Sequence, residues 1–193
     1  VSNTPDTLVW NTKNKLSVWN TQALTFIRIR ANMLSNQARE DYHMKYIAYG
    51  SNMVEEQMAY RCPNAKLIGT GQLPNHRLEF YLHATVERSR ARGASVPVAV
   101  WEIDAEDEQS LDHYEGFPKY YTKCKRTVLM DDGSRIEGMV YIMNMIRPLI
   151  PHASYYNDIH AAYQKLGLSS EIKRVLELAL QRSIERDRRR HRR

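Results

Sequence analysis

The turn Tyr49-Gly50-Ser51-Asn52 is the first place in the sequence where chemistry could be organised. It follows a β-prone run and precedes an acidic stretch, beginning at Glu55, that is typical of the first turn of a helix. A turn at a helix start presents backbone N–H groups without intrahelical partners, and these suit an anion or a developing oxyanion. The plainer alternative is an ordinary strand-to-helix turn, capped by Ser51 or Asn52.

Glu115 is the second candidate. Asp104 is a good cap for an acidic helix, and Glu115 stands where this helix ends, next to Gly116 and Pro118. Its aromatic neighbours in the sequence are Tyr114, Phe117, Tyr120 and Tyr121. Because aromatic surroundings exclude water, they raise the pKa of a carboxyl group, as a general acid or base requires. The plainer alternative is a surface glutamate at a helix end.

Other common reaction centres are not indicated. Cys62 and Cys124 lie far apart, and neither has a Cys or His at zinc-ligand spacing. Ser51 lacks the Gly-x-Ser-x-Gly setting of a hydrolase nucleophile, and no P-loop or dinucleotide-binding glycine pattern occurs. We therefore expect no metal site. Two cysteines make no disulfide framework, which favours the reducing cytoplasm as the location.

Several strands are expected around the two candidate sites. Residues 45–49, 67–71, 77–82 and 96–103 are rich in strand-forming side chains. The charged segment 85–94 has no apolar period and is expected to be a loop. These assignments already favour a sheet-rich domain.

The clearest local prediction is a hairpin. Residues 122–130 and 136–143 flank 131–134, in which an Asp-Gly step suits a tight turn. Helices are expected over 155–166 and again from residue 169. The apolar face of the last helix is formed by Ile172, Val175, Leu176, Ala179 and Leu180. Together, these elements predict a single α+β (mixed α/β) domain with antiparallel pairing.

The formal net charge of +6 and the pI of about 9.3 suggest a nucleic-acid partner at first. However, residues 44–181 are close to neutral, and the positive charge belongs to the two ends. We predict a domain over 44–181, an N-terminal extension over 1–43 outside the core, and an Arg-rich C-terminal tail over 182–193 that is solvated and frayed. Met44, just before the first strand, is the expected native start. No apolar run is long enough to span a membrane.

Tyr-Gly-Ser-Asn at the end of the first strand, followed by Leu111-Asp112-x-x-Glu115-Gly116, resembles the γ-glutamylcyclotransferase family. The similarity continues in Tyr141 and in Tyr156-x-x-Ile159, and it covers about residues 44–168. Glutathione-specific relatives typically carry Leu where this chain has Asn52. Asn52 therefore favours the AIG2-like branch, which acts on other γ-glutamyl compounds, including γ-glutamyl amines.

The resemblance implies a partly closed β-barrel with flanking helices and one cavity. It implies that Glu115 is the proton-transfer residue. It also implies that the γ-glutamyl part of the substrate is gripped by a loop of Tyr49, Gly50, Ser51 and Asn52. Further tyrosines expected near the pocket are Tyr121, Tyr141 and Tyr156, with Tyr120 as the substitute for Tyr121.

The implied activity is that of a γ-glutamylcyclotransferase, which releases 5-oxoproline and a free amine or amino acid by intramolecular aminolysis, without a metal or organic cofactor. Its partner would be a small γ-glutamyl molecule. The alternative is a non-catalytic binding module for γ-glutamyl or acidic metabolites, although a buried Glu115 does not help to bind an anion. A nucleic-acid-associated protein is the third reading, and it rests on the arginine tail alone.

Overall fold

The computed structural model describes residues 43–144 and 149–192, together with Arg28 and Arg30. The chain divides into two compact units, residues 1–41 and 42–193. Arg28 and Arg30 belong to the first unit, where both are helical and exposed. The predicted N-terminal extension over 1–43 lies almost entirely outside the described residues. All elements below belong to the second unit.

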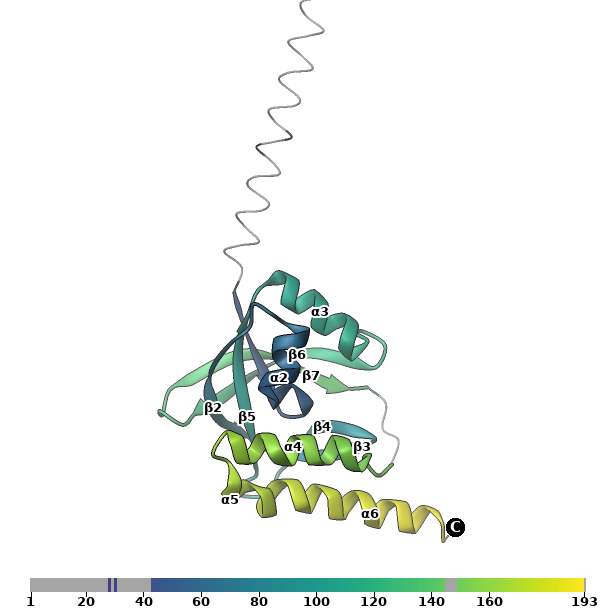
Figure 1. The fold of residues 1–193 in the computed structure, drawn as a ribbon. Helices are drawn as coiled ribbons and strands as arrows, with labels where there is room; N and C mark the ends of the chain where they lie inside the picture. The colour runs from purple at the N-terminus through teal and green to yellow at the C-terminus, as the bar shows by residue number, and fades with distance from the viewer. Residues whose placement is uncertain (1–27, 29, 31–42, 145–148, 193) are drawn as a thin grey trace, which may run out of the picture. The chain divides into compact units, whose positions relative to one another are not determined.

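A closed barrel with the strand order β1-β5-β2-β6-β7 forms the centre of the second unit (Figure 1). The strands are β1 (Met44–Ala48), β2 (Lys66–Pro74), β5 (Ser95–Ile103), β6 (Tyr121–Met130) and β7 (Arg135–Met143). Neighbours pair antiparallel except β1 and β7, which close the barrel in parallel where Tyr46 meets Met139. Each of the five described barrel strands therefore has a neighbour on both sides. The predicted mixed fold around a barrel is confirmed, and so is the hairpin of β6 and β7.

A separate two-stranded sheet, β3 (His76–Tyr81) and β4 (His83–Arg88), corrects the prediction of a loop over 85–94. Thr85 and Val86 are buried in β4. The charged Glu87 hid this strand in the sequence, but its carboxylate accepts hydrogen bonds from Arg77 and Tyr81 on β3. Cross-strand partners thus stabilise a strand that has no apolar alternation of its own.

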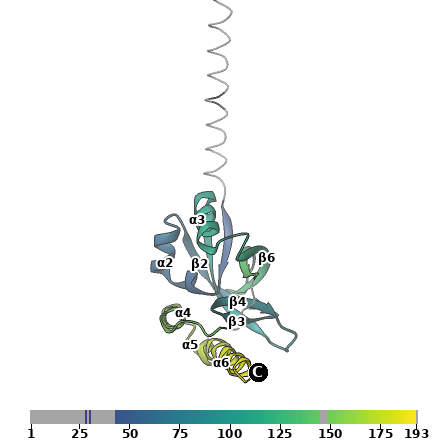
Figure 2. The same cartoon turned by 90° about the vertical axis from the view of Figure 1, so that its right-hand side faces the viewer.

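The remaining elements are helical: η1 (Ser51–Met53, a 3₁₀ turn), α2 (Glu55–Arg61), α3 (Ala105–Glu115), α4 (Ala153–Lys165), α5 (Ser169–Glu171), η2 (Ile172–Glu177, a π-helical stretch) and α6 (Leu178–Arg190). Figures 1 and 2 show α4 and α6 on the side of the molecule that carries β3 and β4. The expected apolar face of the last helix is buried at Ile172, Val175, Leu176 and Ala179, and half-buried at Leu180. None of the helices in the described part of the chain is long and apolar enough to cross a membrane.

Two arginines of α6 form ion pairs with the carboxylate of Glu79 on β3, which is fully buried. Arg182 Nε lies 2.7 Å from Oε1 and Arg186 Nη1 lies 2.7 Å from Oε2, while Arg77 Nε lies 3.0 Å from Oε1. Both helix arginines also donate to backbone oxygens of β3, those of Leu78 (2.7 Å) and Phe80 (3.0 Å). The helix is therefore attached to the strand by charged hydrogen bonds as well as by apolar packing.

This attachment corrects the prediction that residues 182–193 form a solvated tail. Residues 182–190 are the larger part of α6, and Arg182 and Arg186 among them are half-buried. Only its end has the expected character, because Arg188, Arg189 and Arg190 are exposed. The sequence could not show this, since Glu79 lies about a hundred positions away.

Glu79→Gln should lower the free energy of unfolding by about 3 kcal/mol, because it leaves partly buried guanidinium groups without their anion. The matched control is Glu137→Gln. Glu137 forms an exposed pair with Lys125 at 3.6 Å and should lose less than about 1 kcal/mol. Urea unfolding measures both. Equal losses in the two variants would contradict the structural role given to Glu79.

Candidate active site

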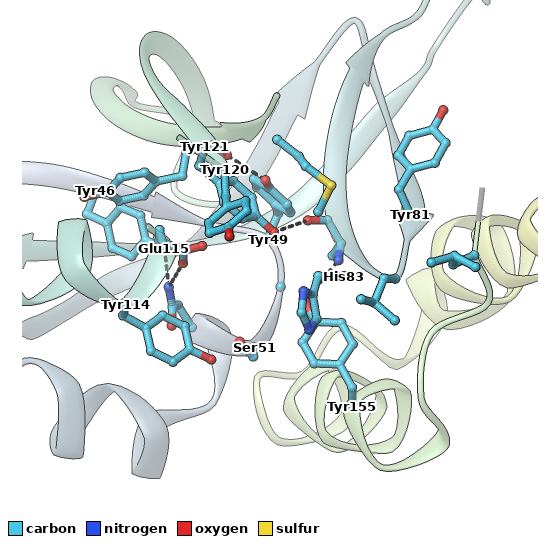
Figure 3. Close-up of a pocket in the computed structure, with 17 residues that line it drawn as sticks. Tyr46, Tyr49, Ser51, Tyr81, His83, Tyr114, Glu115, Tyr120, Tyr121 and Tyr155 are labelled. Carbon is cyan, nitrogen blue, oxygen red and sulfur yellow. Dashed lines mark hydrogen bonds between the residues drawn. The ribbon is translucent and has the colours of Figure 1, made fainter. Parts of the chain in front are cut away.

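A pocket of about 410 Å³ opens between the barrel, β3–β4 and α4, and its volume is that of a small-molecule site. Figure 3 shows Glu115, Tyr46 and Tyr114 at one end, and Tyr81 and His83 at the other. Glu115 is the only carboxylate among the described residues that line it. Its tyrosines are Tyr46, Tyr49, Tyr81, Tyr114, Tyr120, Tyr121, Tyr141 and Tyr155.

Glu115 reaches the pocket because α3 ends there. Asp104 caps the helix start by accepting from the backbone N–H groups of Glu106 (2.9 Å) and Asp107 (2.8 Å), as predicted. At the other end Gly116 adopts a left-handed conformation with φ of 65°. A Cβ atom at Gly116 would also lie 2.6 Å from Cδ2 of Tyr120. Glycine therefore allows both the chain reversal and the close approach of the Tyr120 ring.

A side-chain hydrogen bond from Asn52 holds the carboxylate of Glu115. Asn52 Nδ2 donates to Glu115 Oε1 at 2.9 Å and also to the hydroxyl of Tyr46 at 2.6 Å. Burial raises the pKa of Glu115 to about 7, and the hydrogen bond from Asn52 and the charge of Arg61 counteract part of this rise. A carboxyl group with this pKa exchanges protons near neutral pH.

The loop turns tightly before α2, because Met53 N donates to Gly50 O (2.9 Å) and Val54 N to Ser51 O (3.0 Å) in η1. The helix α2 begins at Glu55, as expected, but its N-cap residue is Val54, so neither Ser51 nor Asn52 caps it. The N–H of Met53 is used within the turn, and that of Ser51 acts on the hydroxyl of Tyr155. The candidate donors to an anion or oxyanion in this loop are therefore the N–H groups of Gly50 and Asn52.

Gly50 lets this loop pack against two other elements. A Cβ atom there would lie 3.1 Å from the hydroxyl of Tyr155 on α4 and 3.3 Å from Cβ of Ala84 on β4. Both contacts are tighter than ordinary van der Waals contact. A side chain at this position would therefore push α4 or β4 away from the loop.

Hydroxyl groups of the pocket tyrosines are mostly directed by protein partners. Tyr49 donates to the backbone oxygen of Tyr141 (2.6 Å), and Tyr141 donates to Asp112 Oδ1 (2.6 Å). The hydroxyl of Tyr121 donates to the backbone oxygen of Ala84 at 3.4 Å. Burial raises the pKa of Tyr49, Tyr121 and Tyr141, so all three phenols are neutral at physiological pH.

Of the residues expected at the site, Tyr156 is the one that the structure places elsewhere. It lies outside the pocket lining, with its ring centre 6.2 Å from those of Phe80 and His160. The preceding Tyr155 lines the pocket instead, and its hydroxyl accepts from Ala84 N at 3.1 Å. Consecutive residues of a helix point about 100° apart, and α4 is turned so that Tyr155 faces the cavity while Tyr156 packs near Phe80.

The other expected residues are brought together. The pocket contains the whole loop and Glu115, and it contains both members of the Tyr120 and Tyr121 pair between which the sequence left a choice. Sequence reasoning missed Tyr46, His83 and Arg61. Tyr46 carried one usable signal, since it lies on the first strand just before the candidate loop.

The comparisons with known proteins agree with this geometry. The family described as gamma-glutamyl cyclotransferase, AIG2-like, matches residues 46–158. Gamma-glutamylcyclotransferases of Bos taurus and Homo sapiens are 28% and 27% identical to the chain over 144 and 145 residues, which is 68% of this chain and 76% of each relative. A solved structure of a gamma-glutamyl cyclotransferase superposes with a TM-score of 0.64 at 25% identity, covering 70% of this chain and 87% of that one.

Gly116→Ala should destabilise the protein more than Gly133→Ala. Both glycines have a positive φ, but a Cβ at Gly133 would meet nothing within 4 Å. The control should therefore lose only the backbone term of about 1 kcal/mol. Overlap with Tyr120 should add about 1–3 kcal/mol at Gly116. Urea unfolding compares them, and equal losses would show that the contact with Tyr120 is unimportant.

Glu115→Gln should stabilise the protein at alkaline pH. The folded-state pKa of about 7 exceeds the ordinary 4.5, so between these values the folded state binds more protons than the unfolded state. Stability therefore falls as pH rises through this window. Glutamine removes the penalty, so the variant should gain about 2 kcal/mol near pH 8 and little near pH 4. A difference that does not depend on pH would contradict the burial of Glu115.

Proposed function

The chain belongs to the AIG2-like gamma-glutamyl cyclotransferase family, and we propose that it is an enzyme that releases 5-oxoproline and a free amine or amino acid from a γ-glutamyl compound. The observation that carries the proposal is a desolvated carboxylate, that of Glu115, with a pKa of about 7 and a fixed hydrogen-bond donor, Asn52. A site built only to bind an anionic metabolite gains nothing from such a group.

The reaction is an intramolecular aminolysis. The α-amino nitrogen of the glutamyl group attacks its own γ-carbonyl carbon, and a new C–N bond closes a five-membered ring. The C–N bond to the leaving amine then breaks. Since both reacting groups belong to one molecule, the remaining task is to hold the chain in a curled conformation.

Glu115 supplies the proton transfer. At neutral pH part of the population is ionised and can accept a proton from the attacking nitrogen. The protonated carboxyl group then delivers this proton to the leaving nitrogen. The balance closes without an added oxidant or reductant, because the proton removed from one nitrogen ends on the other.

The surroundings suit the remaining steps. The N–H groups of Gly50 and Asn52 are the proposed partners of the α-carboxylate or of the oxyanion. The pocket continues from Glu115 toward Tyr81 and His83, which gives the leaving amine room at that end. Within this proposal the enzyme works in the cytoplasm, where free thiols such as those of Cys62 and Cys124 persist.

Glu115→Gln should lower 5-oxoproline release by at least about 100-fold, because glutamine keeps the shape of the side chain and removes the base. The assay uses a panel of γ-glutamyl amino acids and γ-glutamyl amines, and Glu137→Gln on the barrel surface serves as the control. Near wild-type turnover in Glu115→Gln would rule out the assignment. Binding of 5-oxoproline without turnover of any panel member by the wild type would favour the binding module.

A further inference from the structure

Arg61, the last residue of α2, does not line the pocket but contacts residues that do. Its Nη1 donates to the side-chain oxygen of Asn52 and lies 3.4 Å from Ser51 Oγ. Its Nη2 donates to the hydroxyl of Tyr114 at 2.6 Å. The guanidinium carbon also lies 3.6 Å from the centre of the Tyr114 ring. One side chain thus touches the loop and the end of α3 that carries Glu115.

The contact with Asn52 decides which way its amide points. An asparagine amide has an oxygen that only accepts and a nitrogen that only donates. A guanidinium group only donates, so the oxygen must face Arg61. The NH₂ group is then left for Glu115 and Tyr46, as the 2.9 Å and 2.6 Å distances show. The reversed amide would set two acceptors, the amide oxygen and the carboxylate, against each other.

We infer that Arg61 is a positioning residue of this site: by holding the side-chain oxygen of Asn52, it keeps the NH₂ group of that amide on the Glu115 carboxylate. The catalytic consequence rests on the proposed function. The orientation itself does not, and it can be measured without turnover.

Arg61 is itself held in place. Gln57, one turn earlier on α2, accepts from Arg61 Nη2 at 2.7 Å, and its own amide donates to Asp158 on α4 at 3.2 Å. The side chains therefore form a continuous series from α4 through α2 to the loop and α3. A planar guanidinium group can serve Asn52, Gln57 and Tyr114 together, whereas a lysine cannot reproduce this geometry.

Among the described residues that act on Glu115, Arg61 is the only charged one. The titratable groups that face its carboxylate from β1, the loop after it, β6, β7 and α4 are phenols. Burial raises the pKa of each of them: Tyr46, Tyr49, Tyr121, Tyr141 and Tyr155. Arg61 is the cation that acts on Glu115. Its removal should therefore appear directly in the titration of this residue.

The test is a carbon NMR titration of protein labelled at the glutamate carboxyl groups, with the Glu115 signal assigned from its loss in Glu115→Gln. Arg61→Gln should raise the pKa of Glu115 by about one unit or more. Lys165→Gln is the matched control, because it removes a cation that pairs with Glu55 and Glu56 of α2 and does not contact Asn52. The control should leave the Glu115 pKa unchanged. An unchanged value in Arg61→Gln would overturn the inference.

A double-mutant cycle tests whether Arg61 acts through the amide. The shift caused by Arg61→Gln should shrink by at least about half in an Asn52→Leu background, and equal shifts in both backgrounds would contradict the inference. Arg61→Lys keeps the positive charge, and it still tests the inference if Arg61→Gln does not fold. It should still raise the Glu115 pKa, but by less, and a wild-type titration in this variant would also overturn the inference.

Turnover gives a second readout. The acidic limb of the kcat/KM profile of Arg61→Gln should move to higher pH by the shift seen in the titration, and activity should recover at alkaline pH. A uniform loss across the pH range would indicate a merely structural role. Absence of turnover in the wild type would contradict the proposed function, and the titration would still decide the role of Arg61.

Discussion

Removing Glu115 from water has a cost that one hydrogen bond, from Asn52 at 2.9 Å, only partly offsets. Most other residues of the site position Glu115 and Asn52. Asp104 and Gly116 define the two ends of the helix that carries the carboxylate, and Arg61 orients the amide opposite. A stronger set of donors would keep the carboxylate ionised, and a weaker one would keep it protonated. In either case it would exchange protons poorly near neutral pH.

The scaffold around this pair depends on residues beyond the part of the chain that matches the family, which ends at residue 158. Glu79 anchors α6 to β3, and β3 ends at Tyr81, which lines the pocket together with the next residue, Leu82. Leu82 has a φ of 83°, an uncommon value for a residue other than glycine, and its N–H donates to Leu149 O at 3.2 Å. The C-terminal helix thus supports one wall of the pocket.

Local signals predicted much of this. The Asp-Gly turn and the cap at Asp104 depend on neighbours in the sequence, and their placement was correct. Features set by distant partners were missed. β4 is a strand because of its pairing with β3, Arg186 is half-buried because of Glu79, and Tyr155 faces the pocket because of how α4 is rotated against Ala84. The orientation of an amide by Arg61 leaves no trace in composition or periodicity.

In the proposed reaction, the substrate closes a ring onto itself instead of being hydrolysed. Reaction of a γ-glutamyl substrate in water enriched in the heavy oxygen isotope, followed by mass spectrometry, tests this most directly. Intramolecular aminolysis predicts 5-oxoproline without heavy oxygen, in equal amount with the released amine, because no water atom enters the product. Free glutamate carrying one heavy oxygen as the first product would contradict the account.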